Sequence, residues 1–407
     1  MKANFIYSDL NPCGGGERFT LVTMQAILEM GIDVELTTLE EPNVTKLENA
    51  YGKDLASIIN GIKKVNVLSM FDEQSITNNM KNGCDVIINT HGDIDPYYDD
   101  SLSKSNSITY CHFPSAKYLI QSEDKSYLEK HLKIGRMLSL SSSAATTDSI
   151  EKNEAHQNID DYNKKRYINW LKCAYDNLMR NSAILTNSEY SKKAIFDAYG
   201  LDDAIVLSPP VDVDTFRNSA FSSSSFDDDN EREDVVLVVS RIDPSKNIEN
   251  AINFAKLLKE NKIGKGMIIT GSLDHYFDGY YDKLKKMIID LKLLDYVTFE
   301  INVSLDKLLS FMKKSKVYFH PRPGEHFGMS IVEAMSAGLI PIVPDIGGQT
   351  EFEPLNYRYN VLQKATQIAS SAFSVPYSER VQISNSVDRF STLNYKRHFQ
   401  QMICELW

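Results

Sequence analysis

The chain has 407 residues, more than one ordinary hydrophobic core needs, so two domains are expected. Hydrophobic residues make up 42% and charged residues 24%, a composition that excludes a disordered protein. The formal net charge of −11, without a stripe of Lys and Arg interleaved with aromatics, excludes nucleic acid as a partner.

The apolar runs and the cysteines indicate where the protein is located in the cell. No apolar run reaches the roughly 20 residues that span a bilayer, and the first residues enter a strand pattern directly. The five cysteines are scattered, odd in number and without metal-ligand spacing, which predicts neither disulfides nor zinc. We therefore expect a cytoplasmic protein without a metal or other cofactor. A local basic patch leaves peripheral association with a membrane open.

The first elements are strand, glycine turn, helix and strand, the unit of a doubly wound parallel sheet. They cover residues 2–8, 9–18, about 17–30 and 32–38. Glycines at positions 14 to 16 let a backbone approach a ligand where a Cβ would collide, so Gly15 and Gly16 are candidate contacts. Because the spacing is neither a P-loop nor a dinucleotide fingerprint, a plain flexible turn is the alternative.

Three further strands are expected at residues 65–68, 85–89 and 107–111. The pair Asp93 and Asp95 follows the second of these, where a metal site or a solvated turn would fit, and the Gly/Pro-punctuated loop favours the turn. His112 stands at the carboxyl end of the third strand, where parallel sheets bind ligands. A hydrogen-bonded structural histidine is the competing interpretation.

Residues 162–179 carry apolar side chains at helical spacing with lysines and arginines between them. An amphipathic helix packed on the core is the simpler interpretation, and a helix lying on a membrane surface is the alternative. Residues 206–216 contain two prolines and no helix pattern, which predicts a domain boundary near Pro210. The acidic run Asp227–Asp229 is interpreted as a solvated loop.

The second half repeats the alternation of strands and helices. A buried strand at 235–239 leads through Arg241 and Lys246 into a helix at 248–260. Two cations at the top of a parallel sheet suit a diphosphate leaving group, although an exposed pair with Asp243 would look the same. Further strands are expected at 266–271, 297–301 and 340–343, with helices at 280–291, 307–314 and 390–407, the last anchored by Phe390, Tyr395, Phe399 and Trp407.

The most informative stretch runs from Val317 to Gly338 and predicts a strand, a loop and a helix beginning near Ser330. The helix start offers unpaired backbone N–H groups and positive dipole charge to a diphosphate. Glu325 in the loop and Glu333 one turn into the helix can border one pocket. The alternative is a capping box, in which Glu333 only returns to the backbone of Ser330.

The string Glu-x-Phe-Gly-Met-Ser-x-Val-Glu-Ala-Met-x-x-Gly from Glu325, followed by Pro341, Gly347-Gly348 and Glu351, resembles the paired-glutamate signature of retaining glycosyltransferases of family 4. That family has the GT-B fold, an α/β architecture of two Rossmann-like doubly wound parallel-sheet domains facing a cleft. The resemblance implies an acceptor domain at 1–209, a nucleotide-sugar domain at 210–389 and a helix at 390–407 that crosses back.

The resemblance also implies roles for individual residues. Glu333 would bind the ribose hydroxyls, Glu325 would face the hexose, and Arg241 with Lys246 would neutralise the diphosphate in place of a metal. His112 lies in a segment that resembles a family position facing the transferred sugar. The main-chain N–H groups offered to sugar and phosphate would come from His326, Phe327, Gly328, Met329 and Ser330.

The glycine turn with Glu17-Arg18 and the His112 segment look like those of asparagine-linked-glycosylation mannosyltransferases. This implies GDP-mannose as donor and a polyprenyl- or dolichyl-diphosphate-linked oligosaccharide, or another glycan, as acceptor. A UDP-sugar stays open, because backbone groups near Ile301 would read the base. Another GT-B enzyme, such as a nucleotide-sugar epimerase or a phosphorylase, and a non-catalytic sugar-binding subunit are the alternatives.

Overall fold

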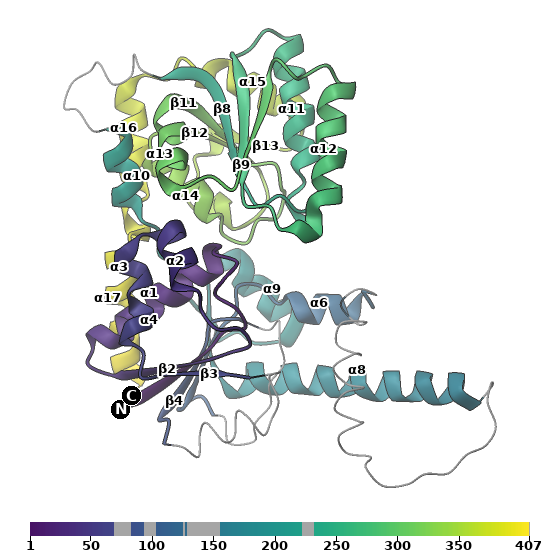
Figure 1. The fold of residues 1–407 in the computed structure, drawn as a ribbon, viewed down its shortest axis with the longest axis vertical. Helices are drawn as coiled ribbons and strands as arrows, with labels where there is room; N and C mark the ends of the chain where they lie inside the picture. Colours follow the sequence, from purple (N-terminus) through teal and green to yellow (C-terminus); the bar gives the residue numbers. More distant parts are fainter. Residues whose placement is uncertain (69–82, 93–102, 125–126, 128–154, 222–231, 407) are drawn as a thin grey trace.

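The computed structural model describes residues 1–68, 83–92, 103–124, 127, 155–221 and 232–406; near the start of helix α8 it describes the backbone but few side chains. Two α/β units, each with its own sheet, follow one another along the long axis of the molecule (Figure 1). This confirms the expected fold class, two doubly wound parallel-sheet units.

The first sheet has seven strands in the order β3-β2-β1-β4-β5-β6-β7, and every pairing is parallel. Its strands are β1 Lys2–Ile6, β2 Asp33–Thr38, β3 Lys64–Val67, β4 Val86–Asn89, β5 Ser107–Tyr110, β6 Ala183–Thr186 and β7 Ile205–Val206. The helices of this unit are α1 Gly15–Glu29, α2 Val44–Tyr51, α3 Lys53–Ala56, α4 Ile58–Gly61, α6 Ser115–Gln121, α8 Ala155–Asn181 and α9 Glu189–Tyr199.

The second sheet has six parallel strands in the order β10-β9-β8-β11-β12-β13. Its strands are β8 Glu233–Val239, β9 Gly266–Gly271, β10 Val297–Ile301, β11 Ser315–Phe319, β12 Ile340–Pro344 and β13 Arg358–Tyr359. Its helices are α10 Val213–Ala220, α11 Ile248–Glu260, α12 Asp278–Asp290, α13 Leu305–Lys314, α14 Met329–Ser336, α15 Leu362–Ala372 and α16 Tyr377–Ser386, with 3-10 turns at Pro244–Lys246 (η2), His275–Phe277 (η3), Gly348–Glu351 (η4), Leu355–Tyr357 (η5) and Asp388–Phe390 (η6).

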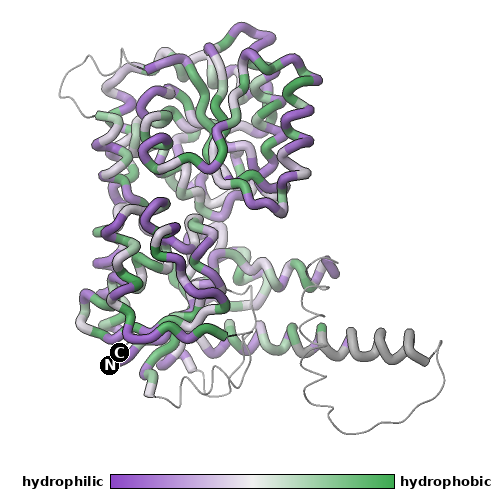
Figure 2. The backbone as a smooth tube through the Cα atoms, viewed as in Figure 1, coloured by the Kyte–Doolittle hydropathy of each residue, from purple (hydrophilic) through white to green (hydrophobic). Residues whose placement is uncertain are grey.

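The sequence forms these sheets because its strands are apolar on both sides. Val236, Leu237 and Val238 in β8 are all fully buried, as expected for a parallel strand covered by helices on both faces. Figure 2 shows hydrophobic residues concentrated along the strands in both units. Each unit has a main core of its own, and the chain passes from one to the other between Leu207 and Val211.

The final helix, α17 Thr392–Leu406, returns to the first unit and runs beside α1 (Figure 1). Tyr395 and Phe399 lie in the core of the first unit, and the Tyr395 hydroxyl lies 2.7 Å from Thr23 Oγ1. Phe390 is also buried, but it lies in the 3-10 turn η6 and packs against Phe327 and Phe352 in the core of the second unit. The terminal helix therefore begins after it, at Thr392, and not at Phe390 as predicted. Trp407 lies outside the described residues.

Two other local predictions also differ from the structure. Residues after the paired prolines form helix α10, which Asp212 begins by accepting a hydrogen bond from the backbone N–H of Thr215 at 3.3 Å. This Asp cap was overlooked because the prolines dominated the pattern. The glycine run is not a free loop, because Gly15 and Gly16 are the first residues of α1.

Helix α8 is much longer than predicted and extends away from the first unit (Figure 1). At its carboxyl end Leu171, Tyr175 and Leu178 are buried in the protein, as an ordinary packed helix requires. None of the helices in the described parts of the chain is both long and apolar enough to cross a bilayer.

Candidate active site

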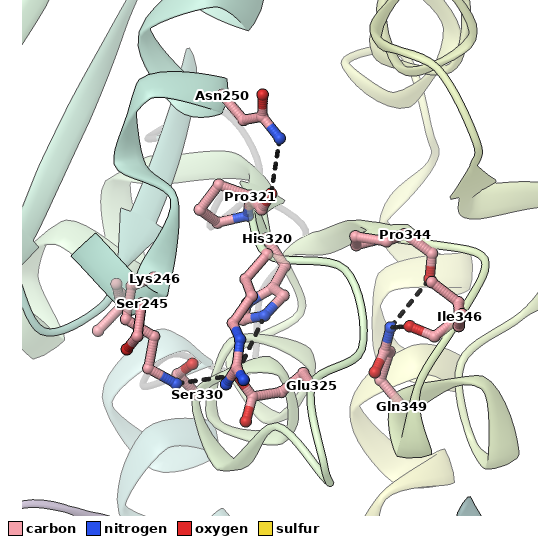
Figure 3. Close-up of polar contacts among 12 residues, drawn as sticks. Ser245, Lys246, Asn250, His320, Pro321, Glu325, Ser330, Pro344, Ile346 and Gln349 are labelled. Carbon is pink, nitrogen blue, oxygen red and sulfur yellow. Dashed lines mark hydrogen bonds and ion pairs between the residues drawn. The ribbon is translucent and has the colours of Figure 1, made fainter. Parts of the chain in front are cut away.

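The centre of the site is an ion pair between Lys246 and Glu325, which come from two different loops of the second unit. Lys246 ends the 3-10 turn after β8, and Glu325 lies in the loop between β11 and α14. Lys246 Nζ donates to Glu325 Oε2 at 2.9 Å, and the two side chains are only 17% and 13% exposed. Figure 3 shows both side chains directed toward each other.

Two more side chains approach the same carboxylate. His320 Nε2 lies 3.4 Å and Arg322 Nη1 lies 3.7 Å from Glu325 Oε2. Burial alone would raise the pKa of Glu325, but His320, Lys246 and Arg322 together hold that pKa well below its ordinary value. The carboxylate is therefore ionised at neutral pH. Sequence reasoning missed His320 and Arg322, although His320 stands at the carboxyl end of a predicted strand.

The second ring nitrogen of His320, Nδ1, faces the Tyr318 hydroxyl. The nitrogen and this hydroxyl lie 3.4 Å apart, and the hydroxyl in turn lies 2.8 Å from Ser330 Oγ. Ser330 therefore faces back to β11 and does not cap α14; the structure places Gly328 at the N-cap without a side-chain cap bond. The capping-box interpretation of Ser330 and Glu333 is wrong.

Gly328 has a structural reason to be glycine. Its φ of 97° is in the left-handed region, and an added Cβ would meet Ile331 Cδ1 at 2.5 Å. This turn brings the chain into α14, whose first backbone N–H groups, including those of Met329 and Ser330, have no acceptor inside the helix. Phe327 beside it is buried in the core of the second unit, so only its main chain can serve a ligand.

Glu333 lies one turn into α14 and faces the first unit. Burial raises the pKa of Glu333 to about 7, while Arg18 lowers it and Asp212 raises it. Arg18 belongs to α1 and lies 3.4 Å from Asp212 across the boundary between the two units. Sequence reasoning noticed Arg18 only as part of the glycine turn and did not place it opposite Glu333.

Arg241 lies at the edge of this arrangement. Its side chain is 61% exposed, and its Nε lies 3.7 Å from Asp243 Oδ2. Within the described part of the chain, neither Arg241 nor Glu333 forms an ion pair or hydrogen bond with Lys246 or Glu325. The structure thus brings Lys246 and Glu325 into direct contact, whereas Arg241 pairs with Asp243 and Glu333 interacts with Arg18 and Asp212.

The glycine turn meets the start of α14 across the boundary. A Cβ added to Gly15 would lie 2.9 Å from Met329 Sδ, and one added to Gly16 would lie 2.6 Å from the Tyr7 hydroxyl. The backbone N–H of Gly14 donates to Glu17 Oε2 at 2.6 Å, which fixes the start of α1. Two of the glycines therefore permit close approaches, one of them to the helix that begins at Met329.

His112 and His326 lie near each other from opposite units. His112 Nε2 lies 3.0 Å from the Thr90 carbonyl, and burial lowers the pKa of His112 to about 4, so its ring is neutral. The His326 ring stacks on Phe113 with centroids 4.0 Å apart and planes 2° apart. Ser188 Oγ also donates to the His326 carbonyl at 2.7 Å. These contacts hold the loop between β11 and α14 against the first unit.

Some predicted features lie outside the described residues, namely Asp93 and Asp95 and the acidic run at 227–229. Within the described ranges, no group of His, Cys, Asp and Glu side chains could hold a metal ion. A separate hollow of about 630 Å³ lies beside Asn250, Pro323 and Tyr359 at the carboxyl ends of β11 to β13. It contains neither Glu325 nor Lys246.

Part of the second unit matches a known protein family. Residues 223–365 match the family model described as Glycosyl transferases group 1. The match runs from before β8 into the first turn of α15 and includes Arg241, Lys246, Glu325 and Glu333.

Among curated proteins, the chain is 26% identical over 212 residues to the GDP-Man:Man(3)GlcNAc(2)-PP-Dol alpha-1,2-mannosyltransferase of Neurospora crassa, covering 49% of this chain and 38% of that protein. It is 30% identical over 158 residues to the O-antigen chain mannosyltransferase RfbU of Salmonella typhimurium, covering 38% of this chain and 42% of that protein. The matched part thus spans about two fifths of the length of these relatives.

Among solved structures, the Anabaena HepE structure in complex with UDP resembles the whole chain. The TM-score is 0.60 at 16% identity, and the alignment covers 100% of both chains. At this identity the likeness concerns the fold, which is shared over both units.

Proposed function

We propose, for a chain that contains a group 1 glycosyltransferase domain on the GT-B fold, that it transfers a hexose from a nucleotide-diphosphate sugar to a glycan or lipid-linked oligosaccharide. The observation that carries the proposal is the buried Lys246–Glu325 pair, which lies beside the amino end of α14 within the matched domain. A cation and a carboxylate side by side suit a substrate that has an anionic diphosphate joined to a neutral sugar.

In the proposed complex the donor diphosphate lies against Lys246, Arg241 and the first backbone N–H groups of α14. Lys246 and Arg241 supply positive charge as the glycosidic bond breaks, which stabilises the departing diphosphate. Glu325 accepts hydrogen bonds from hexose hydroxyls, and Glu333 accepts those of the ribose. Because no metal enters this arrangement, we expect chelators to leave the activity unchanged.

The first unit supplies the acceptor side. His112 is neutral and lies near His326. Its Nε2–H donates to the Thr90 carbonyl, so Nδ1 can accept a hydrogen bond from a hydroxyl of the transferred sugar without adding charge. The loop between β11 and α14 is called the donor loop from here on. The contacts of His326 with Phe113 and Ser188 keep the units together around this loop and limit entry of water. We propose retention of the anomeric configuration, with the leaving phosphate accepting the proton of the acceptor hydroxyl.

Mannose is the hexose that we propose, and GDP-mannose is the donor. The support is that the relatives reported above are named as mannosyltransferases, one of them for a dolichol-linked substrate. We also propose that the protein is cytoplasmic and reaches its lipid-linked acceptor by peripheral association with a membrane. Flotation of the purified chain with vesicles containing anionic lipid tests this last part, and recovery of all the protein in the lipid-free fraction would contradict it.

The deciding experiment offers radiolabelled GDP-mannose, GDP-fucose, UDP-glucose and UDP-N-acetylglucosamine with a membrane extract as acceptor source. We expect label in the lipid-linked fraction with GDP-mannose, and an α-linked product by NMR. Interconversion of the free nucleotide-sugar without transfer would support an epimerase instead. Donor binding without any turnover would support a non-catalytic sugar-binding subunit.

A further inference from the structure

Three side chains that carry or can gain positive charge approach a single oxygen of Glu325. Lys246 lies 2.9 Å, His320 3.4 Å and Arg322 3.7 Å from Oε2. The His320 side chain is only 3% exposed, and the carboxylate 13%. An ionised carboxylate at this depth needs a charged or hydrogen-bonding partner, because loss of the partner leaves its desolvation uncompensated.

This inference rests on the function proposed above, in which Lys246 binds the donor diphosphate as well as Glu325. The donor diphosphate carries more negative charge than one carboxylate, and it approaches the same ammonium group. Lysine is a compact point charge on a flexible stem, so it can turn toward the stronger anion. The buried Glu325 would then lose its nearest partner.

His320 is placed to replace that partner. Its Nε2 is buried, and its 3.4 Å approach to the Glu325 carboxylate is too long and poorly aligned for a well-formed hydrogen bond. Its ring is fixed on the other side by the Tyr318 hydroxyl, and the Tyr359 hydroxyl donates to its carbonyl at 2.9 Å. Because its contact with Glu325 is weak, the buried Nε2 is poorly satisfied, and a small movement would let it bond the carboxylate fully.

We propose that binding of a nucleotide-sugar diphosphate transfers Glu325 from Lys246 to His320, and that His320 takes up a proton from solvent as it does so. The carboxylate then keeps its position and its charge while Lys246 serves the diphosphate. His320 acts as a positioning residue for Glu325, and donor binding becomes linked to pH.

The charges around His320 give the direction of this linkage. Burial lowers the pKa of His320 in the donor-free protein, Lys246 and Arg322 lower it further, and Glu325 raises it. Turning Lys246 toward the donor removes one of the opposing charges, and the arriving diphosphate adds a negative one. Both changes raise the pKa of His320, so the sign is uptake of a proton.

Calorimetric titration with GDP-mannose, in the absence of acceptor, measures this proton. The diphosphate diester itself has no group that titrates near neutral pH, so the dependence of the binding enthalpy on buffer ionisation enthalpy counts protons taken up by the protein. Wild type is compared with His320→Gln, which keeps an amide near the position of Nε2 but cannot titrate. His275→Gln, at an exposed histidine on η3, is the matched control.

We expect wild type and His275→Gln to take up about one more proton per bound donor than His320→Gln at pH 7. Glu333 also titrates near this pH, but its contribution is the same in all three proteins and cancels in the difference. Equal proton counts for wild type and His320→Gln would overturn the inference and leave the proposed function standing. No binding of GDP-mannose or UDP-glucose to wild type would defeat the proposed function itself.

Where His320→Gln does not fold, NMR of the wild-type protein labelled at its histidine rings gives the same decision. We expect one of the eight histidines to move to the imidazolium position at pH 7 when GDP-mannose is added. If every imidazole keeps the protonation state that it has in the donor-free protein while the donor binds, Glu325 is not transferred from Lys246 to a protonated His320, and the inference is wrong.

Discussion

The buried carboxyl of Glu333 makes the donor-free protein less stable as pH rises. Burial raises the pKa of Glu333 from 4.5 to about 7. In the unfolded chain the carboxyl group ionises near pH 4.5. Between pH 4.5 and about 7 the unfolded chain therefore loses this proton while the folded protein keeps it, and the folded protein becomes less stable as the pH rises. At about 1.4 kcal/mol per pH unit, the penalty is nearly absent at pH 4.5 and approaches about 3 kcal/mol at pH 8.

The substitution Glu333→Gln removes this penalty with little change of shape. We expect the difference in unfolding free energy between Glu333→Gln and wild type to grow by about 2.5 kcal/mol from pH 5 to pH 8, in favour of the variant. Urea unfolding followed by circular dichroism measures it at both pH values. Glu260→Gln, at an exposed glutamate of α11, is the control and should show no such growth.

The same substitution separates stability from donor binding. If Glu333 accepts the ribose hydroxyls, the variant should bind GDP-mannose at least about tenfold more weakly, because hydrogen bonds to a charged acceptor contribute about 1.5 to 3 kcal/mol. A stability difference that does not change with pH would refute the buried environment that we assign to Glu333. Undiminished donor affinity would refute its role.

Three further substitutions have defined outcomes. Lys246→Met should lower the unfolding free energy by about 3 kcal/mol at pH 7 in urea unfolding, because it leaves Glu325 buried without its nearest cation. Since the pKa of Glu325 is depressed in the folded protein, this loss of stability should fade as the pH falls below 4.5. A loss of stability that persists in acid would contradict the ion pair. Gly348→Ala should cost at least about 2 kcal/mol in urea unfolding, because its Cβ would lie 1.9 Å from a backbone oxygen of the donor loop. The control Gly279→Ala meets nothing within 4 Å, so equal effects at both glycines would disprove the close approach. Glu351→Gln should lower the unfolding free energy by about 1 kcal/mol, since Glu351 accepts two backbone N–H bonds at the start of α9 across the boundary, and unchanged stability would contradict that contact.

Much of the fold could be predicted from the sequence because parallel strands leave a simple pattern. Apolar runs such as Val235–Val239 are recognisable as buried strands without any knowledge of tertiary contacts. Helix α10 was missed because a single Asp cap is a weaker signal than two prolines in a row. The start of α1 was misplaced because glycine rarely begins a helix without help, and here Glu17 supplies that help.

Some residues of the candidate site could likewise be predicted from the sequence, and others could not. The Lys246–Glu325 pair could be expected, because both residues lie at carboxyl ends of strands in one sheet. The approach of Arg18 toward Glu333 could not, because it depends on how the two units meet, and no sequence spacing encodes that geometry. His320 was counted as a strand residue, since a sequence pattern does not show toward which carboxylate a buried ring points.

The central claim is that Lys246 and Glu325 mark the donor site of a hexosyltransferase. Calorimetric measurement of GDP-mannose affinity for wild type and Lys246→Met at pH 7 tests it most directly. The account predicts binding to wild type and an affinity at least about tenfold weaker for Lys246→Met, the value for loss of one charge-assisted contact to a diphosphate. Equal affinity for the two proteins would contradict the account.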